Sequence, residues 1–374
     1  MSMHQWRPAV VGVAAVSTAL LGLTYAPPAH ADGVSCTPDA GGSGLSAAVV
    51  AQPHRTIADR TIDATGCDIG IYVGPGATHV TISGVTVENA NFQGIFAERT
   101  SHLRVAGSTL TGNGFHTTDP SAPPLEGSGV KSYVGQAFAI SLFGVSHSAV
   151  VGNSVHDNGR GGIGVMDNGA NDPGWLMQKQ NPDAPLVPST YDVIAGNHTW
   201  SNYSGCGIVT ATQNFGGRLS NLQIMNNTIT GTIGQFTANG PDIGGIVVAA
   251  DPPESRVDNV NVMGNSVSQS FEGGIIVNAE AFNSSTNRVT VSANTVTANN
   301  WGHLEAPQMA GVLVYANPAP IPPGTTAPRN VATTVTGNTL GAQFYGIWSL
   351  GDFAPKTAGN TISVTPGGTP IFHG

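Results

Sequence analysis

The sequence predicts an all-β solenoid, a parallel β-helix of about 9–11 coils with Pro-rich loop inserts. Three observations support this fold class. A short motif built around Asn recurs along most of the chain, a second motif that starts with Gly lies after nearly every copy, and helix patterning is absent. Val, Ile, Thr, Gly and Asn are frequent, whereas Leu, Glu and Lys are scarce, which favours short strands and turns over helices.

The first motif has the form apolar-x-apolar-x-Gly-Asn-Ser/Thr-apolar. Its copies are VTISGVTV (80–87), LRVAGSTL (103–110), AVVGNSV (149–155), VIAGNHT (193–199), QIMNNTI (223–229), NVMGNSV (261–267), TVSANTV (290–296), TTVTGNTL (333–340) and TAGNTI (357–362). The last seven copies share an Asn, at Asn153, Asn197, Asn227, Asn265, Asn294, Asn338 and Asn360. Asn suits a bend because it tolerates a left-handed backbone, and stacked coils repeat it one above another. We therefore expect a structural ladder of amides.

The second motif is an apolar strand led by Gly in all but one copy. It appears as GIFA (94–97), AISL (139–142), GIGV (162–165), GIVT (207–210), GIVV (245–248), GIIV (274–277), GVLV (311–314) and GIWS (346–349). The shortest spacings between successive first motifs are 22 and 23 residues, and the longer ones add inserts such as 115–127, 171–190 and 317–329. A unit of this size with two clear strands and room for a third fits one coil of a parallel β-helix.

The N-terminal residues 1–31 have the features of a secretory signal peptide. A positive n-region precedes an uncharged apolar run at 9–23, and an A-x-A cleavage pattern follows at 29–31. The run of 15 residues is shorter than the roughly 20 that an uncleaved membrane anchor needs. We expect a secreted protein with an N-terminal cap segment at 32–55 and one β-helix domain at 56–374.

Charge and cysteine content limit the partners and the compartment. The formal net charge is −9 and only 9% of residues are charged, which does not suit nucleic acid or an anionic membrane. We expect a monomer with no membrane contact after signal cleavage. Cys36 and Cys67 lie close together near the mature N-terminus of an exported chain, so we expect a disulfide between them. Cys206 lies in an apolar strand pattern, SGCGIVTA, and is expected to be a buried thiol.

The two repeated motifs resemble those of the right-handed parallel β-helix proteins of the pectin-lyase-like superfamily. The resemblance runs from about Thr56 to the C-terminus and implies a right-handed solenoid. Secreted enzymes that act on polysaccharides dominate that superfamily, which also contains phage tailspikes and adhesins. The polygalacturonase-like motifs Asn-Thr-Asp, Asp-Asp, Gly-His-Gly and Arg-Ile-Lys do not occur in this sequence, and no pectate-lyase-like motif matches. No functional residue is therefore transferred from the resemblance.

Equivalent positions of stacked coils should form columns, and one column is acidic. Counted six residues from the start of the second motif, it contains Thr100, Val145, Asn168, Gln213, Asp251, Glu280, Asn317 and Asp352. Asp251 and Glu280 belong to adjacent coils, about 4.8 Å apart at the backbone. Asp352 lies two coils beyond Glu280, and Asp167 directly precedes the column at Asn168.

A pair of carboxylates this close has chemical value. Like charges raise one pKa of the pair, which is how an acid and a base are separated for glycoside chemistry. We therefore assign catalysis to Asp251 and Glu280, supported by Asp167 and Asp352. Two alternatives remain: the cluster binds Ca²⁺ through its oxygens, or Asp and Asn serve only as turn formers after each strand.

Other polar and aromatic residues are candidates for substrate binding. Arg160 could act as a lyase-type base, clamp a sugar carboxylate or pair with Asp157, and His156 lies in the same turn. Near the start of the second motif, Asp242 and Glu272 fall on adjacent coils. The aromatic candidates, which would stack on sugar rings or cover apolar side surface, are Trp175, Trp301, Tyr315 and Trp348.

Together these features predict a secreted carbohydrate-active enzyme, a hydrolase or lyase, whose partner is an extracellular or cell-wall polysaccharide. The alternative is a non-catalytic carbohydrate-binding or cell-surface β-helix protein. A groove walled by the inserts, with carboxylates on its floor, would favour the enzyme.

Overall fold

The computed structural model describes residues 35–42, 44–115, 138–159, 161–169, 185–203, 205–232, 244–300, 309–316, 321–351 and 354–374. The chain divides into two compact units, Met1–Gly33 and Val34–Gly374, and all described residues belong to the second. The expected signal peptide at 1–31 lies outside the described residues.

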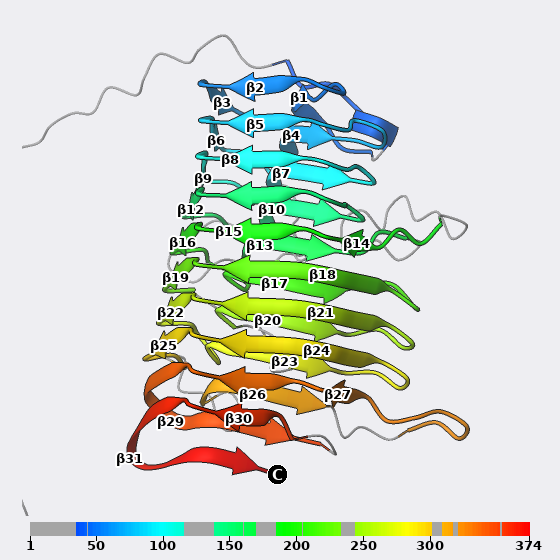
Figure 1. The fold of residues 1–374 in the computed structure, drawn as a ribbon. Coiled ribbons are helices and arrows are strands. Elements are labelled where there is room, and N and C mark those ends of the chain that lie inside the picture. Colours follow the sequence, from blue (N-terminus) through cyan, green and yellow to red (C-terminus); the bar gives the residue numbers. More distant parts are fainter. Residues whose placement is uncertain are drawn as a thin grey trace, which may run out of the picture. The chain divides into compact units, whose positions relative to one another are not determined.

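The described unit is a parallel β-helix in which each regular coil contributes three strands to three ladders. Successive coils follow one another in chain order, as Figure 1 shows along the colour series from blue to red. The prediction of an all-β solenoid is confirmed, since the only helical segment among the described residues is the short 3-10 turn η1 (Ala40–Gly42).

The long ladder is formed by the strands of the second motif. It contains β1 (Ala47–Val50), β4 (Ile69–Val73), β7 (Gln93–Glu98), β10 (Phe138–Phe143), β13 (Gly161–Met166), β17 (Ile208–Thr212), β20 (Ile246–Ala250), β23 (Ile275–Ala279), β26 (Ala310–Ala316) and parts of β29 (Thr339–Leu350) and β31 (Thr361–His373).

The first motif spans two strands, because its Gly-Asn pair is a bend. The strand before the bend belongs to the second ladder, which contains β2 (Thr56–Ala58), β5 (Thr81–Ser83), β8 (Arg104–Ala106), β11 (Ala149–Val151), β15 (Val193–Ala195), β18 (Arg218–Met225), β21 (Arg256–Met263), β24 (Ser285–Ser292), β28 (Thr334–Thr336) and β30 (Lys356–Ala358), with β14 (Ser189–Thr190) and β27 (Arg329–Val331) alongside. The strand after the bend belongs to the third ladder, which contains β3 (Thr61–Asp63), β6 (Thr86–Glu88), β9 (Thr109–Thr111), β12 (Ser154–His156), β16 (His198–Trp200), β19 (Thr228–Thr230), β22 (Ser266–Ser268), β25 (Thr295–Thr297) and the first residues of β29 and β31.

Alternation along the strands fills the interior with Val, Ile and Leu. In the short strands the middle residue is buried and its two neighbours are more accessible, as in β12, where Val155 is fully buried. In the long strands both faces are buried, because Val209, Val247 and Ile276 on the outer face join a second apolar cluster. The ladders are therefore held by one central core and an outer layer over the long strands.

The expected amide ladder runs from Asn153 to Asn360. Each Asn amide nitrogen donates to the side-chain oxygen of the next Asn at 2.9–3.0 Å, through Asn197, Asn227, Asn265, Asn294 and Asn338. The same oxygens accept the backbone N–H of the preceding Asn, and each amide also donates to a strand carbonyl, as from Asn227 to Ile194 at 3.0 Å. The ladder therefore satisfies buried backbone and side-chain groups at one bend of every coil.

The leading Gly of the second motif is required by close packing. A Cβ atom on Gly274 would lie 2.2 Å from Cγ1 of Val296, and one on Gly245 would lie 2.2 Å from Cγ1 of Val267. Such distances are far below van der Waals contact, so only Gly allows a long strand to meet the third-ladder strand of the next coil this closely.

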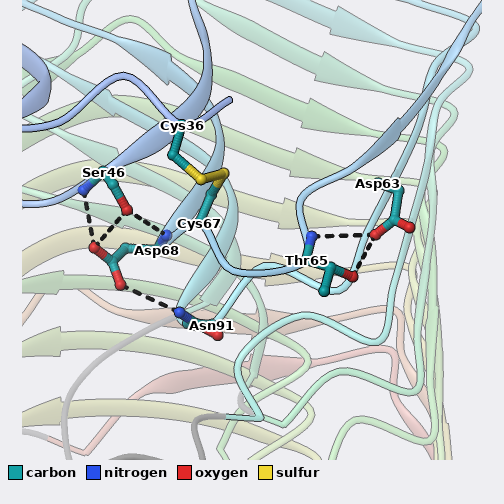
Figure 2. The surroundings of a disulfide bond; sticks show 7 residues. All are labelled: Cys36, Ser46, Asp63, Thr65, Cys67, Asp68 and Asn91. Carbon is teal, nitrogen blue, oxygen red and sulfur yellow. Dashed lines mark hydrogen bonds between the residues drawn. A yellow bond between two sulfur atoms is a disulfide. The ribbon is translucent and has the colours of Figure 1, made fainter. Parts of the chain in front are cut away.

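The expected disulfide between Cys36 and Cys67 is present at the N-terminal end of the long ladder, where it joins the segment before β1 to the segment before β4. Figure 2 shows it beside Asp68, which accepts hydrogen bonds from the backbone and hydroxyl of Ser46 at 2.8 and 2.9 Å. The segment 32–55, expected to form a cap, also supplies β1, so the long ladder begins before residue 56. Cys206 is a buried thiol, 5% exposed.

Candidate functional site

The acidic column lies just after the ends of the long strands, where the structure keeps the coils in register. Ala250 at the end of β20 pairs with Ala279 at the end of β23, so Asp251 and Glu280 follow side by side in adjacent coils. The backbone N–H of Glu280 donates to the carbonyl of Ala250 at 3.1 Å. The expected adjacency of the two carboxylates is thus a property of the backbone register.

The earlier members of the column follow the same register. Thr212 pairs with Ala250, which places Gln213 beside Asp251, and Met166 pairs with Ala211, which places Asn168 beside Gln213. Two column positions, Asn317 and Asp352, lie outside the described residues.

Asp251 combines partial exposure with a buried oxygen. The residue as a whole is partly accessible, but its Oδ1 is shielded from solvent and has no hydrogen-bond partner among the described residues. Burial raises the pKa of Asp251 well above its ordinary value, and the neighbouring Glu280 and Asp167 raise it further because each adds a like charge. Asp251 is therefore a protonated acid over a pH range in which an ordinary Asp is ionised.

Glu280 is held by a hydrogen bond from its own coil. The Nδ2 atom of Asn278, in the fully buried part of β23, donates to Oε1 of Glu280 at 2.9 Å. Glu280 is partly exposed, as is Asp251. The pair thus offers an acid whose proton is retained and a fixed second carboxyl group that solvent can reach.

Asp167 is fully buried, and both oxygens of its carboxyl group accept hydrogen bonds from the next coil. Its Oδ1 accepts the backbone N–H of Gln213 at 2.6 Å, and its Oδ2 accepts Nδ2 of Asn214 at 2.7 Å. Burial raises the pKa of Asp167 to about 6, against the lowering effect of these hydrogen bonds. Asp167 has no exposed surface, and its charge raises the pKa of Asp251.

The predicted residue His156 lies away from the carboxylate pair. His156 stacks on Trp200 at 4.1 Å, and its Nδ1 lies 2.7 Å from Oδ2 of Asp157. It precedes β13 whereas Asp167 follows β13, and six strand residues span roughly 20 Å. His156 therefore lies near the N-terminal ends of the long strands, whereas the carboxylate pair follows their C-terminal ends.

Two predicted aromatic residues lie on the coils after the pair. Tyr315 pairs with Asn278 across β23 and β26, one coil from the residue that holds Glu280. Trp348, in β29, packs against Tyr345 and Phe372 at 4.6 and 4.8 Å. Tyr315 therefore lies beside the pair, and Trp348 belongs to an aromatic cluster near the C-terminus. The predicted residues Arg160, Trp175 and Trp301, together with Asp242 and Asp352, lie outside the described residues.

Sequence analysis missed a polar network on the N-terminal side of the column. Glu98 accepts the hydroxyl of Tyr72 at 2.5 Å and the amide of Asn168 at 3.3 Å, and Nε of Arg99 donates to Oδ1 of Asn168 at 2.7 Å. The network links Asn168, which follows β13, to residues at the end of β7, two coils toward the N-terminus. Its signal was present in the sequence, since Glu98 and Arg99 directly precede the column position Thr100.

Neither a metal centre nor a membrane helix is found in the part of the chain that the structure describes. Within those residues no three His, Cys, Asp or Glu side chains are arranged to hold a metal ion. None of the described segments is a helix long and apolar enough to cross a bilayer.

The register and core define a parallel β-helix whose long strands end at a line of polar and acidic groups. The family of the right handed beta helix region matches residues 46–233, half of the chain, and the protein belongs to this family. The expected handedness and the resemblance to right-handed parallel β-helix proteins are thereby confirmed. No curated protein matches the sequence.

The comparison with solved structures finds similar chains at low sequence identity. The surface adhesin PfbA of Streptococcus pneumoniae is 13% identical with a TM-score of 0.49, over 87% of this chain and 84% of that one. The endo-xylogalacturonan hydrolase of Aspergillus tubingensis is 11% identical with a TM-score of 0.41, over 89% and 88%. The A-module of the mannuronan C-5 epimerase AlgE4 of Azotobacter vinelandii is 14% identical with a TM-score of 0.38, over 85% and 88%.

Proposed function

We propose that the protein is a secreted carbohydrate-active enzyme, a hydrolase or lyase that acts on an extracellular or cell-wall polysaccharide. The observation that supports it is the pair formed by Asp251 and Glu280, in which burial and like charge keep a proton on Asp251. Environments that push apart the pKa values of neighbouring carboxyl groups are typical of acid and base assignments in glycoside chemistry.

Each carboxyl group takes one role. Asp251 donates its proton to the glycosidic oxygen as the bond to the leaving sugar breaks. In hydrolysis, the Glu280 carboxylate attacks the anomeric carbon or removes a proton from the attacking water. In elimination, it removes the proton next to a uronate carboxyl group, and the electron pair expels the oxygen that Asp251 protonates.

The disulfide supports the extracellular part of the proposal. Disulfides such as Cys36–Cys67 persist in oxidising compartments, and an export signal at 1–31 would deliver the chain to one. N-terminal sequencing of protein recovered from the culture medium would test this part separately.

A polysaccharide panel tests the activity. Products are followed as new reducing ends for hydrolysis and as ultraviolet absorbance of unsaturated uronides for elimination. Asp251→Asn and Glu280→Gln keep side-chain size and remove the acid or base, so each is expected to lower turnover by about 10²–10⁴-fold. Glu254→Gln is the matched control, because Glu254 is an exposed carboxylate in the same turn as Asp251.

The outcomes separate the two classes of function. A fall in turnover for both variants, with the control unchanged and all three proteins folded by circular dichroism, supports the enzyme. Binding to a glycan without turnover by the unaltered protein would establish the alternative of a non-catalytic carbohydrate-binding β-helix. Turnover that is unchanged in the Asp251 and Glu280 variants would show that the pair does not carry the catalysis.

A further inference from the structure

Four histidines occupy the same turn in four successive coils. His54, His79, His102 and His147 each lie between a long strand and the following strand of the second ladder. Each has a positive φ, between 54° and 57°, and each backbone N–H donates to a carbonyl of the next coil. We call these four residues the histidine column.

The four imidazole rings are stacked nearly parallel. Ring centroids are 4.9 Å apart between His54 and His79, 4.4 Å between His79 and His102, and 5.3 Å between His102 and His147. The interplanar angles are 17°, 4° and 9°. The coil repeat therefore presents one imidazole about every 5 Å along the column.

The fold does not require histidine at this turn. The later coils place other residues at the same position and with the same sign of φ, namely Tyr191, Asn221, Asn259, Arg288 and Ala332. Asn221 and Asn259 even repeat the side-chain contact, since Nδ2 of Asn259 donates to Oδ1 of Asn221 at 2.7 Å. The turn thus accepts amide, guanidinium, phenol and methyl side chains.

The ring nitrogens of the histidine column are available. All four residues are exposed, and within the described part of the chain their ring nitrogens form no hydrogen bond or ion pair. This contrasts with His156, whose Nδ1 is engaged by Asp157. Neutral imidazoles with unused nitrogens, close together and in water, are ligands for divalent transition metals.

We propose that the histidine column binds divalent first-row transition metal ions, such as Cu²⁺, Ni²⁺ and Zn²⁺, each held by imidazole nitrogens from two neighbouring coils with water completing the coordination. Two nitrogens at about 2.0–2.1 Å from one ion lie roughly 3 Å apart. The rings of the closest pair, His79 and His102, are nearly parallel with centroids 4.4 Å apart, so their in-plane lone pairs do not converge, and both rings have to turn out of the stack to reach one ion.

Rotation of exposed rings supplies this movement. The torsion that turns an imidazole is broad, and no neighbour among the described residues holds these rings by a hydrogen bond. No three of the rings converge on one point, in agreement with the lack of a larger ligand group among the described residues. Each ion would thus be held by two imidazoles at a solvent-exposed site and would exchange with ions in solution. This distinguishes the site from a structural metal centre.

Calorimetric titration of the untagged full-length protein with CuCl₂, NiCl₂ and ZnCl₂ at neutral pH tests the proposal. Saturable binding is expected, tightest for Cu²⁺ in accordance with the general affinity order. The double variant His79→Asn/His102→Asn removes the closest pair, and Asn221 and Asn259 show that this turn accepts Asn. Its affinity for Cu²⁺ is expected to fall at least about tenfold, as for loss of half the imidazole donors.

Two further readouts separate metal binding from a merely structural stack. The control His198→Asn alters an exposed histidine outside the column and should leave Cu²⁺ binding unchanged. Lowering the pH to about 5 should abolish binding, because protonated imidazole cannot coordinate. If the unaltered protein shows no saturable binding, or if the folded double variant binds Cu²⁺ as the unaltered protein does, the proposal is wrong and the column only stacks.

Discussion

Glu280 lies one coil beyond Asp251 in unbroken register, and its carboxyl group contributes to the raised pKa of Asp251. The relationship depends on the backbone, since the strand ends Ala250 and Ala279 are paired directly. A β-helix thus brings together two acidic residues that are separated by 28 residues in sequence. Burial of one oxygen of Asp251 then makes the two groups chemically different.

Stability should fall as the pH rises from acid to neutral. Asp167, Asp192 and Asp251 are carboxyl groups whose pKa is raised by burial above the unfolded value near 3.8. The folded state therefore holds their protons more tightly, and the stability this gives is complete below about pH 4 and is lost as the pH passes the folded pKa. For Asp167, with a pKa of about 6, the loss is about 3 kcal/mol.

Urea unfolding at pH 5 and pH 8 measures this effect. The midpoint is expected to be higher at pH 5, and Asp192→Asn should reduce the difference, because an amide cannot ionise. Glu254→Gln, at an exposed site, should not change it. A midpoint that rises from pH 5 to pH 8 would show that these acids are ionised in the folded protein without cost.

The amide ladder should contribute measurably to stability. Asn227→Ala leaves the amide and backbone N–H of Asn197 without their acceptor in a buried site, and each such group costs about 1–3 kcal/mol. We expect a loss of about 2–4 kcal/mol in the free energy of unfolding. Asn221→Ala is the control, since Ala332 shows that this turn accepts Ala, and equal losses in both variants would contradict the role of the ladder.

The leading Gly of the second motif should resist even a methyl group. Gly274→Ala places Cβ 2.2 Å from Val296 and 2.7 Å from the carbonyl of Gly311, so we expect a loss of at least about 1–3 kcal/mol. Gly341→Ala meets nothing closer than 3.4 Å and should change stability by less than about 0.5 kcal/mol. Thermal unfolding of the two variants compares them directly, and similar midpoints would mean that the close contact is relieved by movement of the coil.

Much of the fold could be predicted because each sequence repeat corresponds to one coil of the β-helix. The recurring Asn marks the bend at which an amide ladder forms, as from Asn153 to Asn197, and the recurring Gly marks the close contact of two strands. Counting from the Gly also placed Asp251 beside Glu280, because coils without insertions inside a strand must keep register.

Side-chain direction and turn positions could not be predicted in this way. The column count puts Asp167 near the pair, but only the structure shows its carboxyl group turned into the next coil against Gln213 and Asn214. The histidine column escaped notice because it lies at a turn between the two motifs, where the remaining coils carry unrelated residues such as Arg288 and Ala332. A period search therefore finds strands and bends more readily than columns that cover only some of the coils.

The central claim is that Asp251 keeps its proton because it is buried beside Glu280. Carbon-13 NMR titration of Asp-labelled protein measures this pKa, with Asp251→Asn to assign the signal. The pKa of Asp251 should lie well above 3.8 in the unaltered protein and fall in Glu280→Gln, while staying above the ordinary value because burial remains. Glu254→Gln should leave it unchanged. An ordinary pKa in the unaltered protein, or one that Glu280→Gln does not lower, would contradict the account.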